Sequence, residues 1–551
     1  MQTIQNPILR GFHPDPSIIR VEDDYYIAVS TFEWFPGVLI YHSRDLMHWE
    51  FCTAPLRRVS QMDLRGVPNS CGIFAPCLSY CDGAFYLVYT IVKTNSIFQD
   101  TDNYLVTARD ISGEWSEPIY LNSTGFDPSL FHDRDGRKWL LNRDCDTRSY
   151  LEERDGILMR EYDPEEQRLV GREYRIYRNK QGTGAEGAHL YYREGYYYLL
   201  TAEGGTDYNH RACLARSRSI LGPYESDPDN PFLTSMENPW NPLQKAGHAS
   251  LVSTQSGEWY IVHLAGRPIP TKGTCILGRE TCLQKVYWNE AGWLRLAQGG
   301  KEPALEVAAP AGEKPLSEIL GEKGLWREER MADEYDDFTR ETLGYPYQTL
   351  RVPLDENVVT LKARRGVLRI YGRDSLHSRY QQALVARRQQ AFCFSAETCM
   401  EYSPENYHQM AGLICMYDTD NFYYLYVTRA ENGERKLNVM VSVLGEISYP
   451  LRDGIELPEG SSIRLRTQVA YDRMYFSYAV KDTYQRIERC FDYSILSDDF
   501  YYQRGEYRFT GAFVGICCQD CYDRKSYADF HFFHYRETAM PDFGSPRESF
   551  R

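Results

Sequence analysis

Four residues with side chains suited to acid–base chemistry recur at one point of a repeated sequence pattern. Asp15, Asp127 and His248 each begin a copy of the pattern, and Glu186 directly precedes the Gly187 that begins another. Equivalent residues meet in space when repeats are arranged around a common axis. A single Asp in such a place is as often a turn or capping residue, but three acids in register predict a shared pocket.

Carboxylates that share a pocket can divide the work of breaking a glycosidic bond. One must carry a proton near neutral pH to protonate the leaving oxygen, and another must be ionised to take a proton from water. A third carboxylate favours the protonated form of its neighbour by like-charge repulsion. This chemistry requires no metal or nucleotide, so we expect a hydrolase that needs no cofactor.

The pattern that carries these residues occurs five times in the first 300 residues. Its copies begin at Asp15, Ala75, Asp127, Gly187 and His248, which are 60, 52, 60 and 61 residues apart. Each copy reads as a β-hairpin with a polar turn and a Tyr- or Trp-rich second strand. Further strands follow within the repeats and bring each unit to about four. The sequence therefore predicts an all-β, five-bladed propeller over residues 1–300, with a long β-sandwich as the weaker alternative.

The composition and the strand spacing of the sequence change after residue 300. Residues 301–325 contain three prolines among Ala, Glu and Lys, which is typical of a linker. Residues 326–537 contain strictly alternating strands at irregular spacing, which indicates a β-sandwich. We expect residues 538–551 to be a loosely attached tail.

Composition limits the partners. The net charge of -15 argues against nucleic acids and anionic membranes, which are themselves polyanions. No signal peptide is visible at the start of the chain, and the 15 cysteines show no disulfide framework, so we expect a cytoplasmic protein. An oligosaccharide is the expected ligand, and the chain is expected to form a homo-oligomer.

Several motifs resemble glycoside hydrolase family 43, and in particular its two-domain β-xylosidase branch. In the first half these motifs are HPDPSIIR, STFEWFPGVLIYHSRDLMHW, SLFHDRDGRKWL, EGAHLYYREGYYYLLTAEGGT, GHASLVSTQSGEWYIVHL and LGRET. In the second half, FTGAFVGICCQD resembles the C-terminal sandwich of the branch, which is concanavalin- or lectin-like. The resemblance covers nearly the whole chain and implies the same five-bladed propeller that the repeats predict.

The resemblance also implies roles for individual residues. Asp15 would be the general base that activates water, and Glu186 would be the general acid. Asp127 would orient the general acid and tune its acidity. Together these roles imply an inverting hydrolase.

The sugar would be bound by residues around these carboxylates. Arg279 would contact its hydroxyl groups, His248 would line the floor of the pocket, and Phe32 would pack against the ring. In the branch a loop of the sandwich closes the pocket, and Phe509 is the candidate for that role here, with Phe513 as the second choice. A closed pocket would make the enzyme exo-acting, so that it releases one sugar at a time from the non-reducing end.

The sequence departs from the branch at positions that line the pocket. Phe74 and Cys145 stand where tryptophans are expected, and Ala185 and Ala188 flank the Glu186–Gly187 pair where Thr and Pro are common. Loss of two indole faces reduces the stacking area for a sugar. We expect an exo-acting β-1,4-xylosidase, with α-L-arabinofuranosidase, as the sole or a side activity, as the alternative, and a sugar-binding propeller without turnover as the least favoured interpretation.

The sequence leaves metal binding open. The acidic run 333–338 together with Asp529 could hold a structural Ca²⁺, since clustered carboxylates suit this ion. A solvated acidic turn is at least an equal interpretation. His248 could also approach a metal on the propeller axis, although a hydrogen-bonded histidine is the preferred interpretation.

Overall fold

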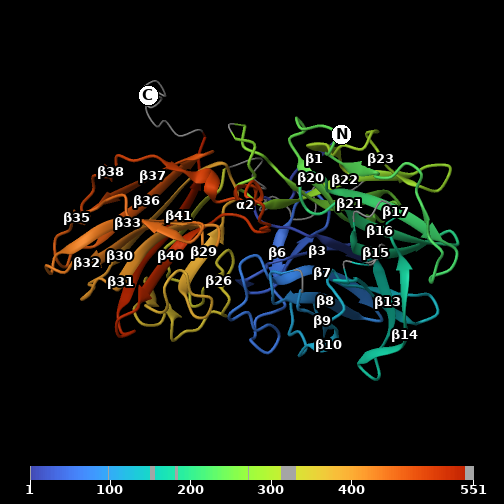
Figure 1. Ribbon diagram of the computed structural model, residues 1–551, viewed down its shortest axis with the longest axis horizontal. Coiled ribbons are helices and arrows are strands. Elements are labelled where there is room, and N and C mark those ends of the chain that lie inside the picture. The colour runs from blue at the N-terminus through green and yellow to red at the C-terminus, as the bar shows by residue number, and fades with distance from the viewer. Residues whose placement is uncertain are drawn as a thin grey trace. The chain divides into compact units, whose positions relative to one another are not determined.

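A computed structural model describes residues 2–96, 99–148, 150, 155–179, 184–270, 272–311 and 331–539. The chain forms two compact units (Figure 1). The first comprises Met1–Arg267 and Arg279–Leu325, and the second comprises Pro268–Gly278 and Trp326–Arg551. The described residues contain many strands but only one α-helix, α2 (Asp498–Tyr502), and one 3-10 turn, η1 (Tyr493–Ile495). The predicted all-β class is confirmed.

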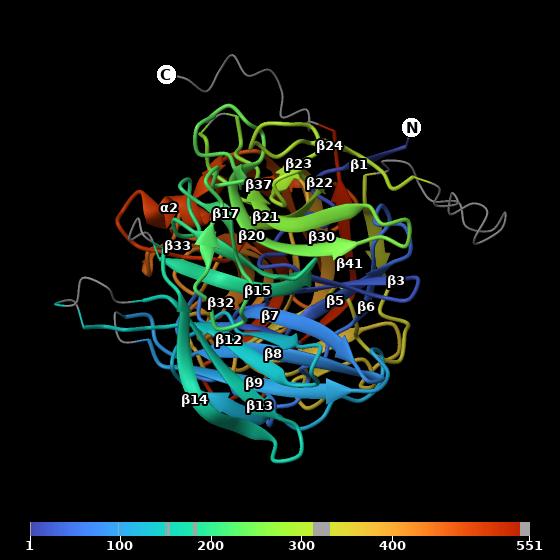
Figure 2. The ribbon, with the colours of Figure 1, turned by 90° about the vertical axis from the view of Figure 1, so that its right-hand side faces the viewer.

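The first unit is a propeller of five antiparallel sheets, and Figure 2 shows several of its blades. The first blade contains β2 (Ser17–Val21), β3 (Asp24–Val29), β5 (Leu39–Ser43) and β6 (Glu50–Thr53), and the second contains β7 (Gly72–Cys81), β8 (Ala84–Val92), β9 (Thr101–Ala108) and β10 (Ile119–Asn122). The third contains β11 (Ser129–His132), β12 (Lys138–Arg143), β13 (Ile157–Asp163) and β14 (Arg168–Tyr177), and the fourth contains β15 (Ala185–Arg193), β16 (Tyr196–Glu203), β17 (Arg211–Ser217), β18 (Glu225–Ser226) and β19 (Leu233–Thr234). The fifth contains β20 (Gln244–Ser253), β21 (Trp259–Gly266), β22 (Arg279–Trp288) and β23 (Leu294–Leu296). Within the same unit, β4 (Trp34–Phe35) lies between β3 and β5 in the chain. The five predicted repeats correspond to these five blades.

Alternation along the second strand of the blades explains how they pack. Consecutive side chains of a strand point to opposite faces, so one contacts the preceding blade and the next contacts the following blade. Five apolar clusters result, one between each pair of neighbours, and they contain Ala28 with Leu87, Val88 with Leu140, Leu141 with Leu199, Leu200 with Ile261, and Val262 with Ile27. The last cluster joins the fifth blade to the first and closes the ring.

The innermost strands of all five blades surround one cavity. Its volume is about 430 Å³, and its lining includes Ser17, Ser79, Ser129, His189 and Ser250, one from each blade. The innermost strands of the five blades therefore surround one axis, as the repeat predicts. A further pair of strands, β1 (Thr3–Gln5) and β24 (Glu306–Ala308), joins the two ends of the propeller chain.

The second unit is a sandwich of two antiparallel sheets. One sheet contains β25 (Asp333–Asp336), β27 (Val359–Thr360), β28 (Leu368–Tyr371), β30 (Cys393–Glu401), β36 (Ile463–Ala470), β37 (Arg473–Ala479), β38 (Gln485–Arg486), β39 (Phe491–Asp492) and β41 (Tyr527–Glu537). The other contains β29 (Ala383–Arg388), β31 (Gln409–Met416), β32 (Phe422–Arg429), β33 (Arg435–Val443), β34 (Glu446–Ser448), β35 (Ile455–Glu456) and β40 (Phe513–Asp520). Also in this unit is β26 (Thr349–Leu350). A single apolar core fills the space between the sheets.

The boundaries of the units differ from the prediction in two places. The chain stays with the propeller beyond residue 300, because β24 pairs with β1. The segment Pro268–Gly278, between β21 and β22, belongs to the sandwich, where Ile269, Ile276 and Leu277 join the apolar core. Most of the predicted linker 301–325 and of the tail 538–551 lies outside the described residues.

Charged side chains of the sandwich are engaged in ion pairs. Asp529 accepts two hydrogen bonds from Arg369, and Asp336 pairs with Arg340 at 2.6 Å. Among the described residues, no group of three or more His, Cys, Asp or Glu side chains could hold a metal ion. These pairings give no support to a calcium site built from 333–338 and Asp529.

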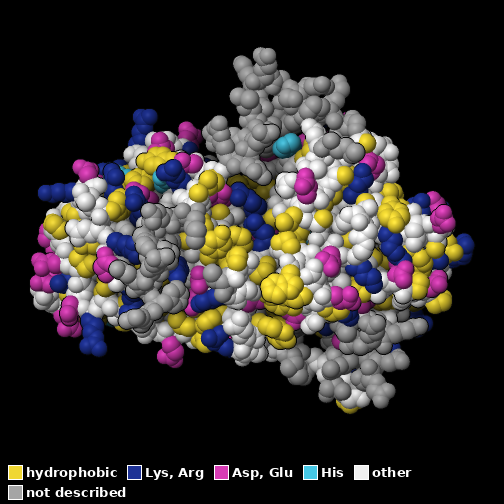
Figure 3. Space-filling model, turned by 90° about the horizontal axis from the view of Figure 1, so that it is seen from above, with side chains coloured by type: hydrophobic (Ala, Val, Ile, Leu, Met, Phe, Trp, Pro, Cys, Tyr) yellow, Lys and Arg dark blue, Asp and Glu magenta, His cyan; other side chains and the backbone are white. Residues whose placement is uncertain are grey.

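The surface carries both signs of charge. On the face in Figure 3, basic and acidic side chains are interspersed among apolar and neutral ones. No helix within the described ranges has the length and apolarity needed to cross a membrane.

Candidate active site

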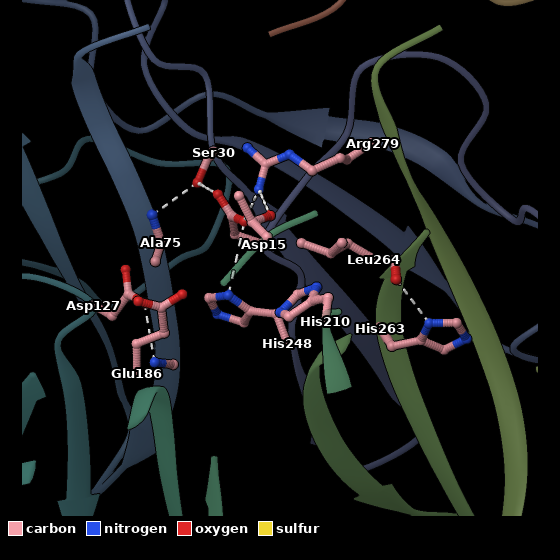
Figure 4. Close-up of polar contacts among 12 residues, drawn as sticks. Asp15, Ser30, Ala75, Asp127, Glu186, His210, His248, His263, Leu264 and Arg279 are labelled. Carbon is pink, nitrogen blue, oxygen red and sulfur yellow. Dashed lines mark hydrogen bonds and ion pairs between the residues drawn. The ribbon is translucent and has the colours of Figure 1, made fainter. Parts of the chain in front are cut away.

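The five residues at the equivalent position of the repeats share an unusual backbone conformation. Their φ angles are +53° at Asp15, +35° at Ala75, +55° at Asp127, +55° at Gly187 and +50° at His248. The left-handed region costs an L-residue roughly 1–2 kcal/mol, so such residues persist only where the surrounding structure holds them. Its occurrence in all five blades shows that the repeats are in register. It also turns the side chains of three blades toward one another (Figure 4).

Asp15 lies in the middle of this cluster and accepts hydrogen bonds from two directions. Its Oδ2 accepts from the Ser30 hydroxyl at 2.6 Å, and its Oδ1 accepts from Nη1 of Arg279 at 3.1 Å. Arg279 Nη1 also donates to Oγ1 of Thr206 at 2.7 Å. Donors of this kind stabilise an ionised carboxylate, which is the form that a general base requires.

The donors around Asp15 are themselves fixed by other blades. The Ser30 hydroxyl oxygen accepts a hydrogen bond from the backbone N–H of Ala75 at 2.7 Å. Ala75 is the equivalent of Asp15 in the second blade and carries no functional group of its own. Its contribution to the site is therefore a backbone donor that orients Ser30.

Two buried histidines lie next to Asp15 (Figure 4). Nδ1 of His248 is 3.7 Å from Oδ1 of Asp15, and burial lowers the pKa of His248 despite the nearby acids. Burial, aided by His248, lowers the pKa of His210 to about 3. Both rings are therefore neutral near pH 7 and can exchange hydrogen bonds without adding positive charge.

Asp127 and Glu186 form the other side of the cluster (Figure 4). Asp127 is buried, and its Oδ2 accepts a hydrogen bond from the backbone N–H of Gly187 at 3.0 Å. Burial raises the pKa of Asp127 well above its ordinary value, and the charges of Glu186 and Asp15 add to this effect. The Asp127 carboxyl therefore retains a proton more readily than an isolated one.

Gly187 explains why the acid of the fourth blade precedes the repeat position. A Cβ atom at residue 187 would lie 2.9 Å from Nε2 and 3.0 Å from Cε1 of His248. Only glycine leaves room for this ring and adopts the positive φ without strain. The carboxylate is consequently supplied by Glu186, one residue earlier on β15.

Arg143, at the end of β12, contacts Glu186 directly. Its Nη1 donates to Oε2 of Glu186, and its Nη2 lies 3.9 Å from Oδ2 of Asp155. The guanidinium carbon is 4.9 Å from the centre of the Phe126 ring. Glu186 raises the pKa of Arg143 although burial opposes it, so the guanidinium keeps its charge.

Three phenylalanine rings of the propeller pack against one another next to Arg279. The ring centres of Phe32 and Phe74 are 4.6 Å apart, and Phe32 is 5.6 Å from Phe12. The guanidinium carbon of Arg279 lies 5.6 Å from the centre of the Phe32 ring. Phe32 therefore lies next to Arg279, which donates to Asp15, and Phe74 packs against Phe32.

Two further residues were singled out in the sequence, Cys145 and Phe509. Cys145 has a thiol whose pKa is raised to about 12 by burial, so the thiol is neutral, and its Sγ lies 3.7 Å from Oε1 of Gln99. Phe509 belongs to the second unit, between α2 and β40. Its predicted role in closing the pocket stays a prediction.

The structure thus brings Asp15, Asp127, Glu186, His248 and Arg279 together, whereas sequence reasoning missed several of their partners. Ser30 begins the motif STFEWFPGVLIYHSRDLMHW and Thr206 ends the motif EGAHLYYREGYYYLLTAEGGT, but neither was singled out as a site residue. Arg143 stands in the segment NRDCD, two residues before the Cys145 that drew attention. Arg143 could have been found as a basic residue at the end of a predicted propeller strand.

Comparisons with known proteins agree with this geometry. A family model described as "Glycosyl hydrolases family 43" matches residues 4–294, and one described as "Beta xylosidase C-terminal Concanavalin A-like domain" matches residues 335–536. A beta-xylosidase from Bacillus subtilis (strain 168) is 47% identical over 545 residues, which cover 97% of this chain and 99% of that protein. Xylosidase/arabinosidase 43B from Humicola insolens is 45% identical over 98% of this chain and 99% of its own length. The crystal structure of a xylan beta-1,4-xylosidase from Bacillus halodurans C-125 superposes with a TM-score of 0.92, at 50% identity, over 97% of this chain and 100% of that chain.

Proposed function

Because this chain belongs to glycosyl hydrolase family 43, we propose that it is an exo-acting β-xylosidase. It would release single xylose units from the non-reducing end of β-1,4-xylo-oligosaccharides. The names of the relatives from Bacillus subtilis and Bacillus halodurans support xylose as the sugar, and the second supports the β-1,4 linkage.

One observation carries the proposal: three carboxylates from three blades gather at one repeat position but in unlike surroundings. Asp15 is bonded to Ser30 and Arg279, which suits an ionised base. Asp127 is buried, with a raised pKa, next to Glu186. A difference of this kind between neighbouring carboxyls is what divides acid from base in glycoside hydrolysis.

The proposed reaction proceeds in one displacement. Asp15 takes a proton from a water molecule while the water oxygen bonds to the anomeric carbon. The bond from this carbon to the leaving oxygen breaks, and Glu186 gives its proton to that oxygen. Attack from the opposite face inverts the anomeric centre, which requires the two carboxyls to be roughly 6.5–9.5 Å apart. No cofactor takes part.

The remaining site residues would bind and orient the sugar. Arg279 has donors aimed at the centre of the cluster, where sugar hydroxyls would lie. His248, neutral beside Asp15, would form the floor, and the paired rings of Phe32 and Phe74 would pack against the sugar. Phenylalanine in place of tryptophan at residue 74 leaves a smaller stacking surface.

We propose further that the sandwich contributes Phe509 to the pocket. The segment FTGAFVG and its resemblance to the pocket-closing loop of the β-xylosidase branch support this role. Replacing Phe509 with Ala should raise KM for xylobiose about 2- to 10-fold, which corresponds to the loss of one aromatic contact. An unchanged KM would separate the sandwich from substrate binding.

Arabinose is the second candidate sugar. The Humicola insolens relative is named as both a xylosidase and an arabinosidase, and β-D-xylose and α-L-arabinofuranose present similar hydroxyl groups. Rates of p-nitrophenol release from the two aryl glycosides decide between them. A higher kcat/KM for the arabinofuranoside would overturn the assignment of xylose.

Loss of sugar release in Glu186→Gln would exclude a sugar-binding propeller without turnover.

Homo-oligomer formation and a cytoplasmic location are proposed as well. The second is supported by fifteen cysteines with no disulfide bond among the described residues. Light scattering coupled to size-exclusion chromatography tests the first.

A further inference from the structure

The contact between Arg143 and Glu186 raises a chemical problem for the proposed reaction. A general acid must carry a proton when the glycosidic bond breaks. A guanidinium at hydrogen-bond distance instead stabilises the ionised carboxylate, and this pair is largely buried, with side-chain exposures of 25% and 17%. While Arg143 donates to Oε2 of Glu186, this oxygen acts as a hydrogen-bond acceptor and cannot offer a proton to a leaving group.

The structure offers Arg143 a second carboxylate. Nη2 of Arg143 lies 3.9 Å from Oδ2 of Asp155, about 1 Å beyond the usual N–H···O distance of roughly 2.9 Å. The Nε atom of Arg143 is buried and has no hydrogen-bond partner within the part of the chain that the structure describes. A small rotation of the side chain would therefore exchange Glu186 for Asp155 without breaking another polar contact of the guanidinium.

We propose that Arg143 is a positioning residue that alternates between Glu186 and Asp155 during the catalytic cycle. It pairs with Asp155 while Glu186 is protonated and a leaving group is bound. It pairs with Glu186 after that proton has moved to the leaving oxygen and the carboxylate is charged. Glu186 takes up its next proton from solvent when Arg143 turns back. The inference rests on the proposed role of Glu186 as general acid.

Other charged and titratable groups also face this pair. Glu186 is near Asp127 and near His248 on β20, and Arg143 is near Asp127, Cys145 and Asp155. The Cys145 thiol and the His248 ring are neutral near pH 7. The groups around Arg143 that can gain or lose a charge are therefore the carboxyls of Glu186, Asp155 and Asp127. Asp155 is the one among them that faces Arg143 from outside the catalytic cluster.

Two substitutions test the exchange because they should move the pH profile in opposite directions. Arg143→Met removes the charge that holds Glu186 ionised, so the basic limb of kcat/KM should move to higher pH by roughly one unit. Asp155→Asn weakens the second partner, so Arg143 stays on Glu186 and the basic limb should move to lower pH. In Asp155→Asn, kcat should fall more for xylobiose than for p-nitrophenyl xyloside, whose leaving group needs little protonation.

Controls separate this role from simple support of the fold. Arg143→Lys should restore much of the wild-type profile, because it keeps a charged donor. Arg175→Met removes an arginine that pairs with Asp144 nearby, and it should leave the basic limb unchanged. If Arg143→Met does not fold, Asp155→Asn alone still tests the direction of the shift.

The outcomes separate a failure of the role of Arg143 from a failure of the proposed function. Basic limbs that do not move, or that move in the same direction in both variants, would overturn the role of Arg143. If instead Glu186→Gln slows xylobiose and the aryl xyloside equally, the general acid itself is misassigned and the proposed function fails first.

Discussion

In the proposed mechanism the pocket has a base side, formed by Asp15, Ser30 and Arg279, and an acid side, formed by Glu186, Asp127 and Arg143. Each side contains one arginine bonded to one carboxylate. Arg279 is held by a second hydrogen bond to Thr206, whereas Arg143 has an ion-pair alternative in Asp155. The first arrangement fixes a charge, and the second allows a charge to change.

This difference matches the roles proposed for the two carboxylates. The base is ionised at the start of each cycle and benefits from permanent donors. The acid alternates between its neutral and charged forms, and a permanent cation would arrest it in one of them. Two ion pairs of similar appearance can therefore have opposite effects on catalysis.

The largest effects are expected from removing the carboxyls proposed as base and acid. Asp15→Asn should lower kcat by about 10²–10⁴-fold for xylobiose and for p-nitrophenyl xyloside alike, because both need an activated water. Glu186→Gln should slow xylobiose within the same range but the aryl xyloside much less. Steady-state rates on the two substrates measure this contrast. Equal leaving-group dependence in both variants would abolish the distinction between the two sides.

A smaller loss is expected where the two sides touch. In Gly187→Ala, the new Cβ would collide with His248, which lies against Asp15, while the backbone beside Glu186 would be strained. A displacement of this kind should reduce kcat/KM by about 100-fold.

Two further variants show whether the collision or the backbone strain is responsible. Gly136→Ala has φ of +89° but open space around its Cβ, so it should cost stability without a comparable loss of activity. When His248 is already replaced with Ala, the Gly187→Ala change should reduce kcat/KM less than it does in the wild type, because the ring it collides with is absent. Additive effects in this double-mutant cycle would argue against a steric link.

The smallest effect on turnover, roughly tenfold, is expected from Asp127→Asn. Removing a carboxyl next to Glu186 should also move the basic limb of kcat/KM to lower pH. Because the pKa of Asp127 is raised by burial, its contribution to stability is present below its unfolded value of about 3.9 and is lost as the pH rises through the folded value.

Asp127→Asn should therefore melt at the same temperature as the wild type near pH 4 and at a higher temperature near pH 8. Each kcal/mol recovered would correspond to roughly 2–4 °C for a domain of 150–250 residues. Thermal unfolding at several pH values measures the difference. A variant that is less stable at pH 8 would show that the Asp127 carboxylate supports the fold.

Much of this site could be predicted from the sequence because the repeat converts position along the chain into position around an axis. Residues 15, 127, 186 and 248 are far apart in sequence, but their place in the hairpin pattern fixed where each would lie. The offset of Glu186 by one residue also had a visible cause, since a glycine occupies the repeat position itself. The alternating apolar residues that pack between the blades likewise predicted strands.

Other features depended on contacts that no repeat encodes. Arg143 reaches Glu186 from the second strand of a neighbouring blade, and Thr206 reaches Arg279 from a loop. The segment Pro268–Gly278 leaves the propeller pattern to join the sandwich core, and the chain then returns at Arg279. Sequence by itself determined the blades and the acids that begin them, because a period-2 pattern and a fixed repeat length specify both. Only the tertiary structure decided which cation meets which acid, because a long side chain can reach any of several neighbours once the blades are packed.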